Sequence, residues 1–233
     1  VLRIRVNSLF SQIVILDKVK TAEIVVFQGE LDSKTEGNLR MLLKTLTFHS
    51  IDFEITSEKS CRLFEDLIRN REEIKKISIH TNFENSIVED KRIRQMILGL
   101  PAADECHITP SKILWRNQTV LDDQVLDHLI SSFPNFSFDF CRRPTITIAG
   151  LSRAFEAIRS DGNKQHHYSF PICESTVEGF LVQVDRATHK KARLGRFVVV
   201  QHRESGATCK FEYARVIEND NAARIARLDY TPK

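Results

Sequence analysis

The 233-residue sequence predicts an α/β fold in which strand and helix alternate as repeated βα units, followed by an antiparallel β region at the C-terminus. Three observations support this prediction. Apolar residues follow a period of two in some segments and a helical period in the segments between them. The predicted strand centres recur at roughly 24 to 32 residues. From residue 177 onward, short alternating runs replace the helical period.

The first part of the chain changes from strands to a helix. Leu2–Val6 alternates apolar residues with arginines and predicts a half-buried strand. The β-branched runs Gln12–Leu16 and Glu23–Phe27 predict two further strands. Glu36–Thr47 then places four leucines on one helical face, so a helix is expected there.

The middle of the chain continues this alternation. Predicted strands lie at residues 51–55, 74–79, 106–108, 113–115, 136–140 and 168–172. Predicted helices, each with one apolar face, lie at residues 58–69, 87–98, 122–131 and 147–159. Ser57 is the expected N-cap of the first of these helices, because its hydroxyl can accept from a free backbone N–H.

The last quarter of the chain predicts strands at residues 177–184, 196–202, 208–214 and 224–228. Glu204–Gly206 is a turn between the second and third of them. We therefore expect one continuous domain, with a βα-repeat region at 1–176 and a β-rich cap at 177–233. A cap of this kind covers the apolar face that the last repeat would otherwise expose.

Two architectures are compatible with the βα succession. Leucine-rich repeats use one strand and one helix in about 20–29 residues, slightly less than most of the spacings here. An ordinary α/β domain covers both faces of a parallel sheet with helices, so its strands are apolar throughout. Here polar residues such as Asp52, Lys76 and Ser137 alternate with apolar ones, which predicts a solvated sheet face. The pattern favours a leucine-rich-repeat-like βα solenoid.

Composition excludes several classes of protein. The formal charge of +3 is too close to neutral to indicate a nucleic-acid partner. Neither common glycine-rich nucleotide-binding loop occurs. No apolar run approaches the roughly 20 residues of a membrane span, and no signal peptide is visible. The five cysteines are far apart and odd in number, which favours free thiols in an intracellular, cytoplasmic or nuclear setting.

No constellation for catalysis or metal binding is recognisable. On a strand, the adjacent pair His166–His167 would point to opposite faces and could not share a metal ion. On a loop the two side chains could share one, but we interpret them as exposed loop histidines. Asp122–Asp123 opens a predicted helix, where negative charge favours the helix dipole. No Gly-x-Ser-x-Gly motif occurs. The sequence therefore predicts no enzyme activity, no cofactor and no metal site, although an enzyme without local motifs stays a third alternative.

A basic segment between two predicted strands is the candidate partner-binding site. It is interpreted as a long hairpin loop that could grip phosphates or an acidic partner, or as a plain solvated turn. It contains no aromatic residue, which weakens the case for single-stranded nucleic acid. The candidate residues are Arg186, Lys190, Lys191, Arg193 and Arg196.

The order of five stretches resembles a known family. They are Leu2–Val6 with Gln12–Leu16, Leu63–Leu67 with Ile74–Ile79, Ile113–Trp115 through Phe138, Thr147–Leu151, and Arg215–Ala226. Together they resemble the type-2, leucine-rich-repeat-like F-box-associated domain that follows the F-box in nematode F-box proteins. Two positions depart from the pattern: Gly150 stands where the family has an acidic residue, and Asn221 where it usually has glycine.

The resemblance implies a non-enzymatic protein-recognition module that binds the target of a Skp1–cullin–F-box ubiquitin ligase. This sequence contains no F-box, so the Skp1-like adaptor would bind through an F-box expected upstream of Val1. The family has no catalytic residues to transfer. The alternative is a nucleic-acid-binding or other regulatory interaction domain that uses the basic segment 186–196.

Overall fold

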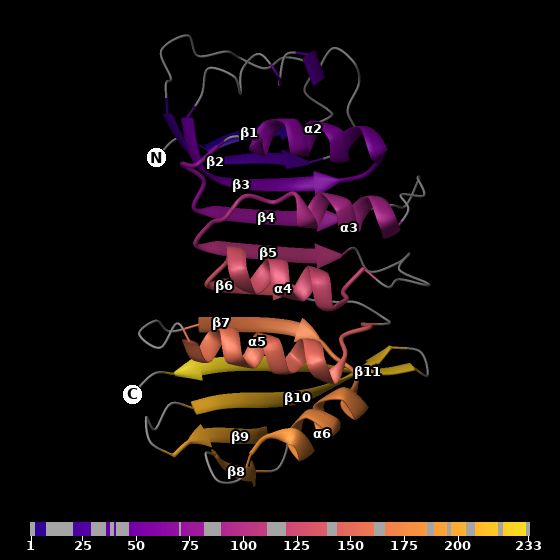
Figure 1. The fold of residues 1–233 in the computed structure, drawn as a ribbon. Helices are drawn as coiled ribbons and strands as arrows, with labels where there is room; N and C mark the ends of the chain where they lie inside the picture. Colours follow the sequence, from indigo (N-terminus) through magenta and orange to yellow (C-terminus); the bar gives the residue numbers. More distant parts are fainter. Residues whose placement is uncertain are drawn as a thin grey trace. The chain divides into compact units, whose positions relative to one another are not determined.

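The computed structural model describes residues 3–7, 21–28, 36–37, 40, 47–69, 71–81, 90–110, 120–138, 144–160, 166–185, 189–194, 197–203, 208–218 and 221–231. The chain divides into two compact units, Val1–Leu114 and Trp115–Lys233. Both units combine strands with helices (Figure 1), so the predicted α/β class is confirmed.

The first unit contains a parallel sheet whose neighbours pair in chain order. Its strands are β1 (Arg3–Asn7), β2 (Thr21–Gln28), β3 (Thr47–Ile55), β4 (Lys76–Thr81) and β5 (Glu105–Pro110). Helix α2 (Glu58–Ile68) follows β3, and helix α3 (Asp90–Leu98) follows β4. Ser57 is the N-cap of α2 as predicted, in a capping box with Ser60.

The core of the first unit forms between the helices and every second residue of the strands. Ile51, Phe53 and Ile55 of β3 are buried, and they are in register with further buried residues of β4 and β5. The ring centroids of Phe53 and Phe64 of α2 lie 5.2 Å apart. This burial explains the period of two, because only one face of each strand meets a helix.

The second unit contains a mixed sheet in the order β6-β7-β11-β10-β9-β8. Strands β6 and β7 are parallel, and every other neighbouring pair is antiparallel. The strands are β6 (Asn135–Phe138), β7 (His166–Pro171), β8 (His189–Leu194), β9 (Phe197–His202), β10 (Thr208–Glu218) and β11 (Asn221–Thr231). The helices are α4 (Asp123–Ser132), α5 (Ile148–Ser160) and α6 (Glu174–Gln183).

Aromatic side chains dominate the core of the second unit. Phe136 of β6 lies 4.8 Å from Tyr168 and 5.9 Å from Phe170 of β7, measured between ring centroids. Phe180 of α6 contacts Phe155 of α5 and Phe211 of β10. These contacts join helices and strands of the unit into one apolar layer.

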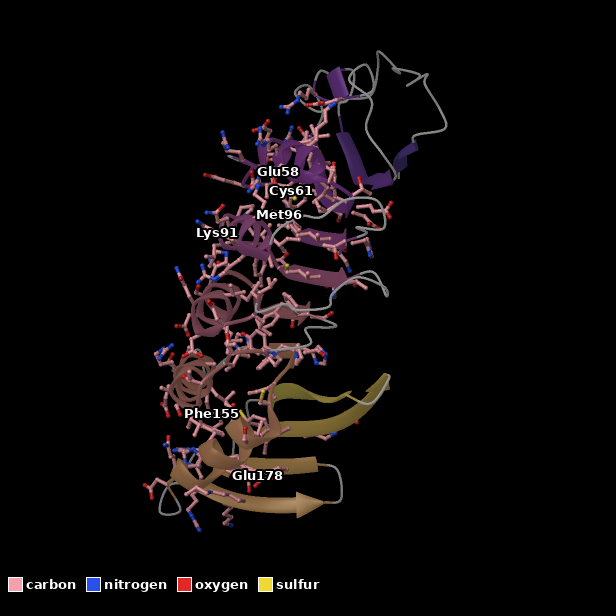
Figure 2. All side chains as sticks on the ribbon, turned by 90° about the vertical axis from the view of Figure 1, so that its right-hand side faces the viewer. Glu58, Cys61, Lys91, Met96, Phe155 and Glu178 are labelled. Atoms are coloured by element: carbon pink, nitrogen blue, oxygen red, sulfur yellow. The ribbon has the colours of Figure 1, made fainter. Side chains whose placement is uncertain are left out.

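Within each unit, the described helices lie on the same face of the sheet. In Figure 2, α2 and α3 lie on one face of the first sheet, and α4, α5 and α6 lie on one face of the second. A sheet sandwiched between two helical layers would have contradicted the sequence prediction of a solvated face. Among the described helices, none is both long and apolar enough to cross a membrane.

Most predicted elements agree with the structure to within a few residues. The predicted strands at 12–16 and 113–115 lie outside the described residues. Of the predicted helix at 36–47, Glu36, Gly37 and Arg40 are helical, and the remainder also lies outside.

The predicted strand at 177–184 is wrong, because this segment belongs to α6. Its buried residues are Val177, Phe180 and Val184, which recur at intervals of three and four, as on one face of a helix. Rich in β-branched and apolar residues, the segment mimics a strand. The predicted boundary between 176 and 177 therefore falls inside a helix, whereas the division into compact units lies between residues 114 and 115.

Candidate interaction surface

Three adjacent strands of the first unit carry polar residues on the face away from α2 and α3. Their neighbours in the strands are buried under the helices, so these side chains point the other way. Nine polar residues lie on this side of the three strands, and all of them are half-buried. We call this surface the open face. Across the sheet the nine residues form three rows: Ser50–Lys76–Glu105, Asp52–Ser78–His107 and Glu54–His80–Thr109.

Ion pairs connect the strands across the open face. The Lys76 Nζ atom lies 2.7 Å from Glu105 Oε2, which joins β4 to β5. The His80 Nε2 atom lies 3.0 Å from Asp52 Oδ1, which joins β4 to β3. Within β5, His107 Nε2 lies 3.4 Å from Glu105 Oε2. Charged side chains on neighbouring strands therefore hold one another in place.

Glu105 is the carboxylate that this network perturbs. Its pKa is held below the ordinary glutamate value, mainly because its carboxylate accepts a hydrogen bond from Lys76, with His107 adding a smaller effect. Desolvation opposes the shift. Glu105 is thus ionised throughout the neutral range, and its negative charge is a permanent part of the open face.

One row contains the residue types of a hydrolytic triad without its geometry. Asp52, Ser78 and His107 lie side by side, but Ser78 occupies the middle position. In a triad the base lies between the nucleophile and the acid. Asp52 instead contacts His80, and no hydrogen bond joins Ser78 to His80 or His107 among the described residues. This row therefore lacks the contact that activates a serine.

The open face suits recognition of another macromolecule. It presents three carboxylates, on Asp52, Glu54 and Glu105, against the single ammonium of Lys76, so its carboxylates outnumber its lysines. Its side chains are half-exposed, so they can form hydrogen bonds and ion pairs with a partner without first leaving the protein core.

The sequence pattern identified part of this surface. The alternation in β3 and β4 predicted solvated positions for Asp52, Glu54, Lys76 and Ser78. It missed His80 and Glu105, because β4 and β5 extend beyond the predicted strands at 74–79 and 106–108. His107 lies inside the second of these strands, but it was not identified as a position on the solvated face. The ion pairs between strands depend on register, for which a single strand's sequence contains no signal.

The predicted basic residues lie in the second unit, and the prediction that 186–196 forms a loop is wrong for most of the segment. Lys190, Lys191 and Arg193 lie on β8, paired with β9. Arg186 and Arg196 lie outside the described residues. The Lys190 side chain is exposed, whereas Lys191 Nζ donates to the carbonyl oxygen of Leu181 at the end of α6. The two lysines therefore face opposite sides of the sheet.

The interpretation of His166 and His167 as loop residues is also wrong, and the predicted exposure is wrong for His166. Both lie on β7, where His167 is exposed and His166 is 4% exposed. The His166 Nδ1 atom lies 3.0 Å from the Tyr168 hydroxyl oxygen, so this histidine belongs to the core. In the described part of the chain, no group of three or more His, Cys, Asp or Glu residues could hold a metal ion.

Asp122 and Asp123 both act at helix N-termini. Asp122 Oδ1 accepts from the Val125 N–H at 2.9 Å and caps α4, the helix that it precedes. Asp123 instead reaches the start of α5, where Oδ1 accepts from the Thr147 N–H at 2.7 Å and Oδ2 from the Thr147 hydroxyl at 2.6 Å. Both carboxylates therefore act at a helix start, as predicted. Asp122 caps α4, whereas Asp123 contacts the start of the following helix, α5.

Comparisons with known proteins complete this description. No family model matches the chain, and neither the curated proteins nor the solved structures include a match.

Proposed function

We propose that this chain is a non-enzymatic protein-recognition module, the target-binding part of an F-box protein that recruits its target to a Skp1–cullin–F-box ubiquitin ligase. The observation that supports recognition is the open face: the described helices of the first unit lie on one side of its sheet, and the other side presents charged residues in register on three strands. The link to the ligase rests on the resemblance to F-box-associated domains.

We further propose that the βα units form a leucine-rich-repeat-like solenoid. Hydrogen bonds between the regions where successive helices begin support this. In the second unit, the N–H of Thr145, which precedes α5, donates to the C=O of Leu121, which precedes α4. One step later, the Thr176 hydroxyl, in the first turn of α6, donates to Ile146 C=O just ahead of α5. Such stacking of one unit on the next is the way a solenoid builds its core.

Recognition on such a surface depends on many modest contacts around a few anchors. The excess of carboxylates over lysines on the open face favours a target segment that presents lysine or arginine. Charge complementarity of this kind increases the association rate and excludes acidic competitors more than it increases affinity. Half-exposed side chains that are already paired, such as Asp52 with His80, are preorganised for such contacts.

The test uses the full-length protein and two charge-matched variants. Asp52→Lys reverses a charge in the centre of the open face, and Glu72→Lys makes the same change at an exposed position outside it. Affinity purification from cells should recover a Skp1-like adaptor with all three proteins. Only Asp52→Lys should lose the target, by tenfold or more in recovered amount.

Two results would contradict the proposal separately. Absence of a Skp1-like adaptor under gentle conditions would remove the ligase assignment. Equal loss of the target with Glu72→Lys, or no loss with either variant, would remove the open face as the recognition surface. Melting curves of both variants within a few degrees of the wild type are required for either conclusion.

A further inference from the structure

Strand β8 ends the sheet of the second unit and is paired along one edge only. All six of its residues, His189–Leu194, are in antiparallel register with β9. In the part of the chain that the structure describes, no strand pairs with its other edge. The outer edge of such a strand offers backbone N–H and C=O groups to an incoming strand.

The backbone hydrogen bonds identify which residues face outward. Residues of an antiparallel strand alternate between those that bond to the partner strand and those that point away from it. The His189 N–H donates to Asp185 C=O at 3.0 Å, so His189 is one of the residues whose backbone groups point away from β9. Lys191 and Arg193 lie two and four residues after His189, so their backbone N–H and C=O groups are also directed away from β9.

Positive charge follows this edge on both sides of the sheet. Lys190 is exposed on the face away from the helices, with no carboxylate paired to it among the described residues. Lys191 and Arg193 occupy the alternate positions of β8. Six consecutive residues thus contain three cations and no carboxylate.

We propose that β8 accepts an acidic extended segment of another protein as an added strand. Backbone hydrogen bonds to Lys191 and Arg193 would provide affinity, and carboxylates at alternate positions of the segment would pair with the basic side chains. This inference goes beyond the proposed function, because it assigns a second recognition site in the other unit and does not need the open face.

A second copy of the chain is a poorer occupant of the same edge. Antiparallel pairing of β8 with β8 centred on Ala192 places Lys191 opposite Arg193 of the other copy. Like charges directly opposite each other destabilise a strand pair. An acidic segment meets the same edge with the opposite sign at both positions. The charge pattern therefore selects a partner strand that differs from β8.

The experiment measures the binding of a fluorescent peptide of alternating glutamate and threonine to the whole chain. Three matched probes accompany it: the same peptide with N-methyl groups on the backbone amides that would face β8, a lysine–threonine peptide, and a single-stranded oligonucleotide. The first control keeps the charge and removes the N–H donors. We expect the acidic peptide to bind at least tenfold more tightly than all three, with an affinity that decreases as salt is added.

Two variants test the backbone contribution at one residue. Arg193→Pro removes both the charge and an outward N–H, whereas Arg193→Ala removes the charge alone. Proline is tolerated on an edge strand where its N–H would face solvent, so β8 should stay paired with β9. We expect Arg193→Ala to weaken peptide binding about threefold and Arg193→Pro by tenfold or more. Circular dichroism and melting temperature establish that both variants fold.

Several results would overturn the inference. Equal binding of the N-methylated peptide, or equal effects of the two folded variants, would show charge attraction without strand addition. Tighter binding of the oligonucleotide would identify a phosphate site, and concentration-dependent dimerisation that displaces the peptide would identify a second copy as the occupant. Absence of peptide binding at low salt would show that β8 does not accept an acidic strand. Its lysines would then serve only to prevent edge-to-edge aggregation. None of these results bears on the open face.

Discussion

At the scale of single residues, Gly150 and Asp123 show why a departure from the expected pattern can be tolerated. A β-carbon at position 150 would lie 2.1 Å from Asp123 Oδ1. The same carboxylate accepts two hydrogen bonds from Thr147, whose hydroxyl in turn accepts from the Gly150 N–H at 3.0 Å. The start of α5 thus receives its acidic group from the preceding helix.

The first prediction concerns the coupling of these two residues. Gly150→Ala should gain about 1 kcal/mol in helix propensity. In the presence of Asp123 it should lose about 1–2 kcal/mol, because the displaced carboxylate no longer caps α5. In the Asp123→Ala background only the gain should remain. A double-mutant cycle by urea denaturation measures the difference, and additive effects within about 0.5 kcal/mol would contradict the contact.

Cysteine chemistry also differs from residue to residue. Cys61, Cys106 and Cys209 are buried and free, and Cys173 is free and exposed. Burial raises the pKa of the Cys61 and Cys209 thiols to about 12 and raises that of Cys106 as well. The thiolate is the reactive form, so these three side chains are protected both by inaccessibility and by protonation.

The second prediction follows from this protection. Iodoacetamide at pH 8 should alkylate Cys173 at least about a hundredfold faster than Cys61, Cys106 or Cys209. Peptide mapping by mass spectrometry distinguishes the sites. Guanidinium chloride should make all four react at similar rates, which serves as the control. Rapid labelling of Cys106 in the native protein would show that the β5 core opens readily.

At the scale of helices and strands, arginines connect α3 to α2 and α5 to α4. Arg92 of α3 donates to both oxygens of Glu65 of α2, at 2.5 and 2.6 Å, and to Glu58 at 2.9 Å. In the second unit, Arg153 of α5 pairs with Asp127 and Asp123 of α4. The Arg92 side chain is 18% exposed and that of Arg153 is 53% exposed. The same arrangement thus occurs in two different solvent environments.

The third prediction compares these two arginines. Arg92→Ala should cost about 1–3 kcal/mol of unfolding free energy, because it leaves the partly buried Glu65 carboxylate without its arginine and leaves Glu58 with Arg62 alone. Arg153→Ala should cost distinctly less, because solvent screens its exposed pair. Chemical denaturation of both variants provides the comparison. An equal cost would mean that solvent exposure does not set the strength of these contacts.

Two elements mark the limit of what could be predicted from the sequence. Helix α6 was predicted as a strand, because Val177 and Val184 are β-branched and Gly179 lowers helix propensity. The structure gives that glycine a packing role, since a β-carbon there would lie 2.3 Å from Ile148 Cδ1. Strand β8 was predicted as a loop, because charged residues on an edge strand do not show apolar alternation. Tertiary contacts decide both cases.

At the scale of the whole molecule, the alternation of apolar and polar residues was the most informative signal. It predicted most strands, and it predicted that helices would cover one sheet face, as they do in each unit. It could not predict the division between residues 114 and 115 or the ion pairs of the open face. Both depend on contacts between segments distant in sequence.

The fourth prediction tests whether helices bury only one face of the first sheet, and it uses two neighbouring residues of β4. Ile77 is buried and Ser78 is half-buried on the open face. Ile77→Lys should cost more than about 4 kcal/mol or prevent folding, because it places an unpaired charge in the core. Ser78→Lys should change stability by about 0.5 kcal/mol or less, since its ammonium lies in water beside Asp52. Thermal denaturation followed by circular dichroism measures both, and similar costs would contradict a solvated face.

The cap that Asp123 provides for α5 has a consequence for the order in which this region is made. A helix with its own N-cap can start to form as soon as its residues leave the ribosome. Helix α5 takes part of its cap from α4, so its first turn reaches full stability only after α4 has docked. Synthesis from the N-terminus delivers Asp123 before Thr147, so this part of the chain is made in the direction in which α4 prepares the start of α5.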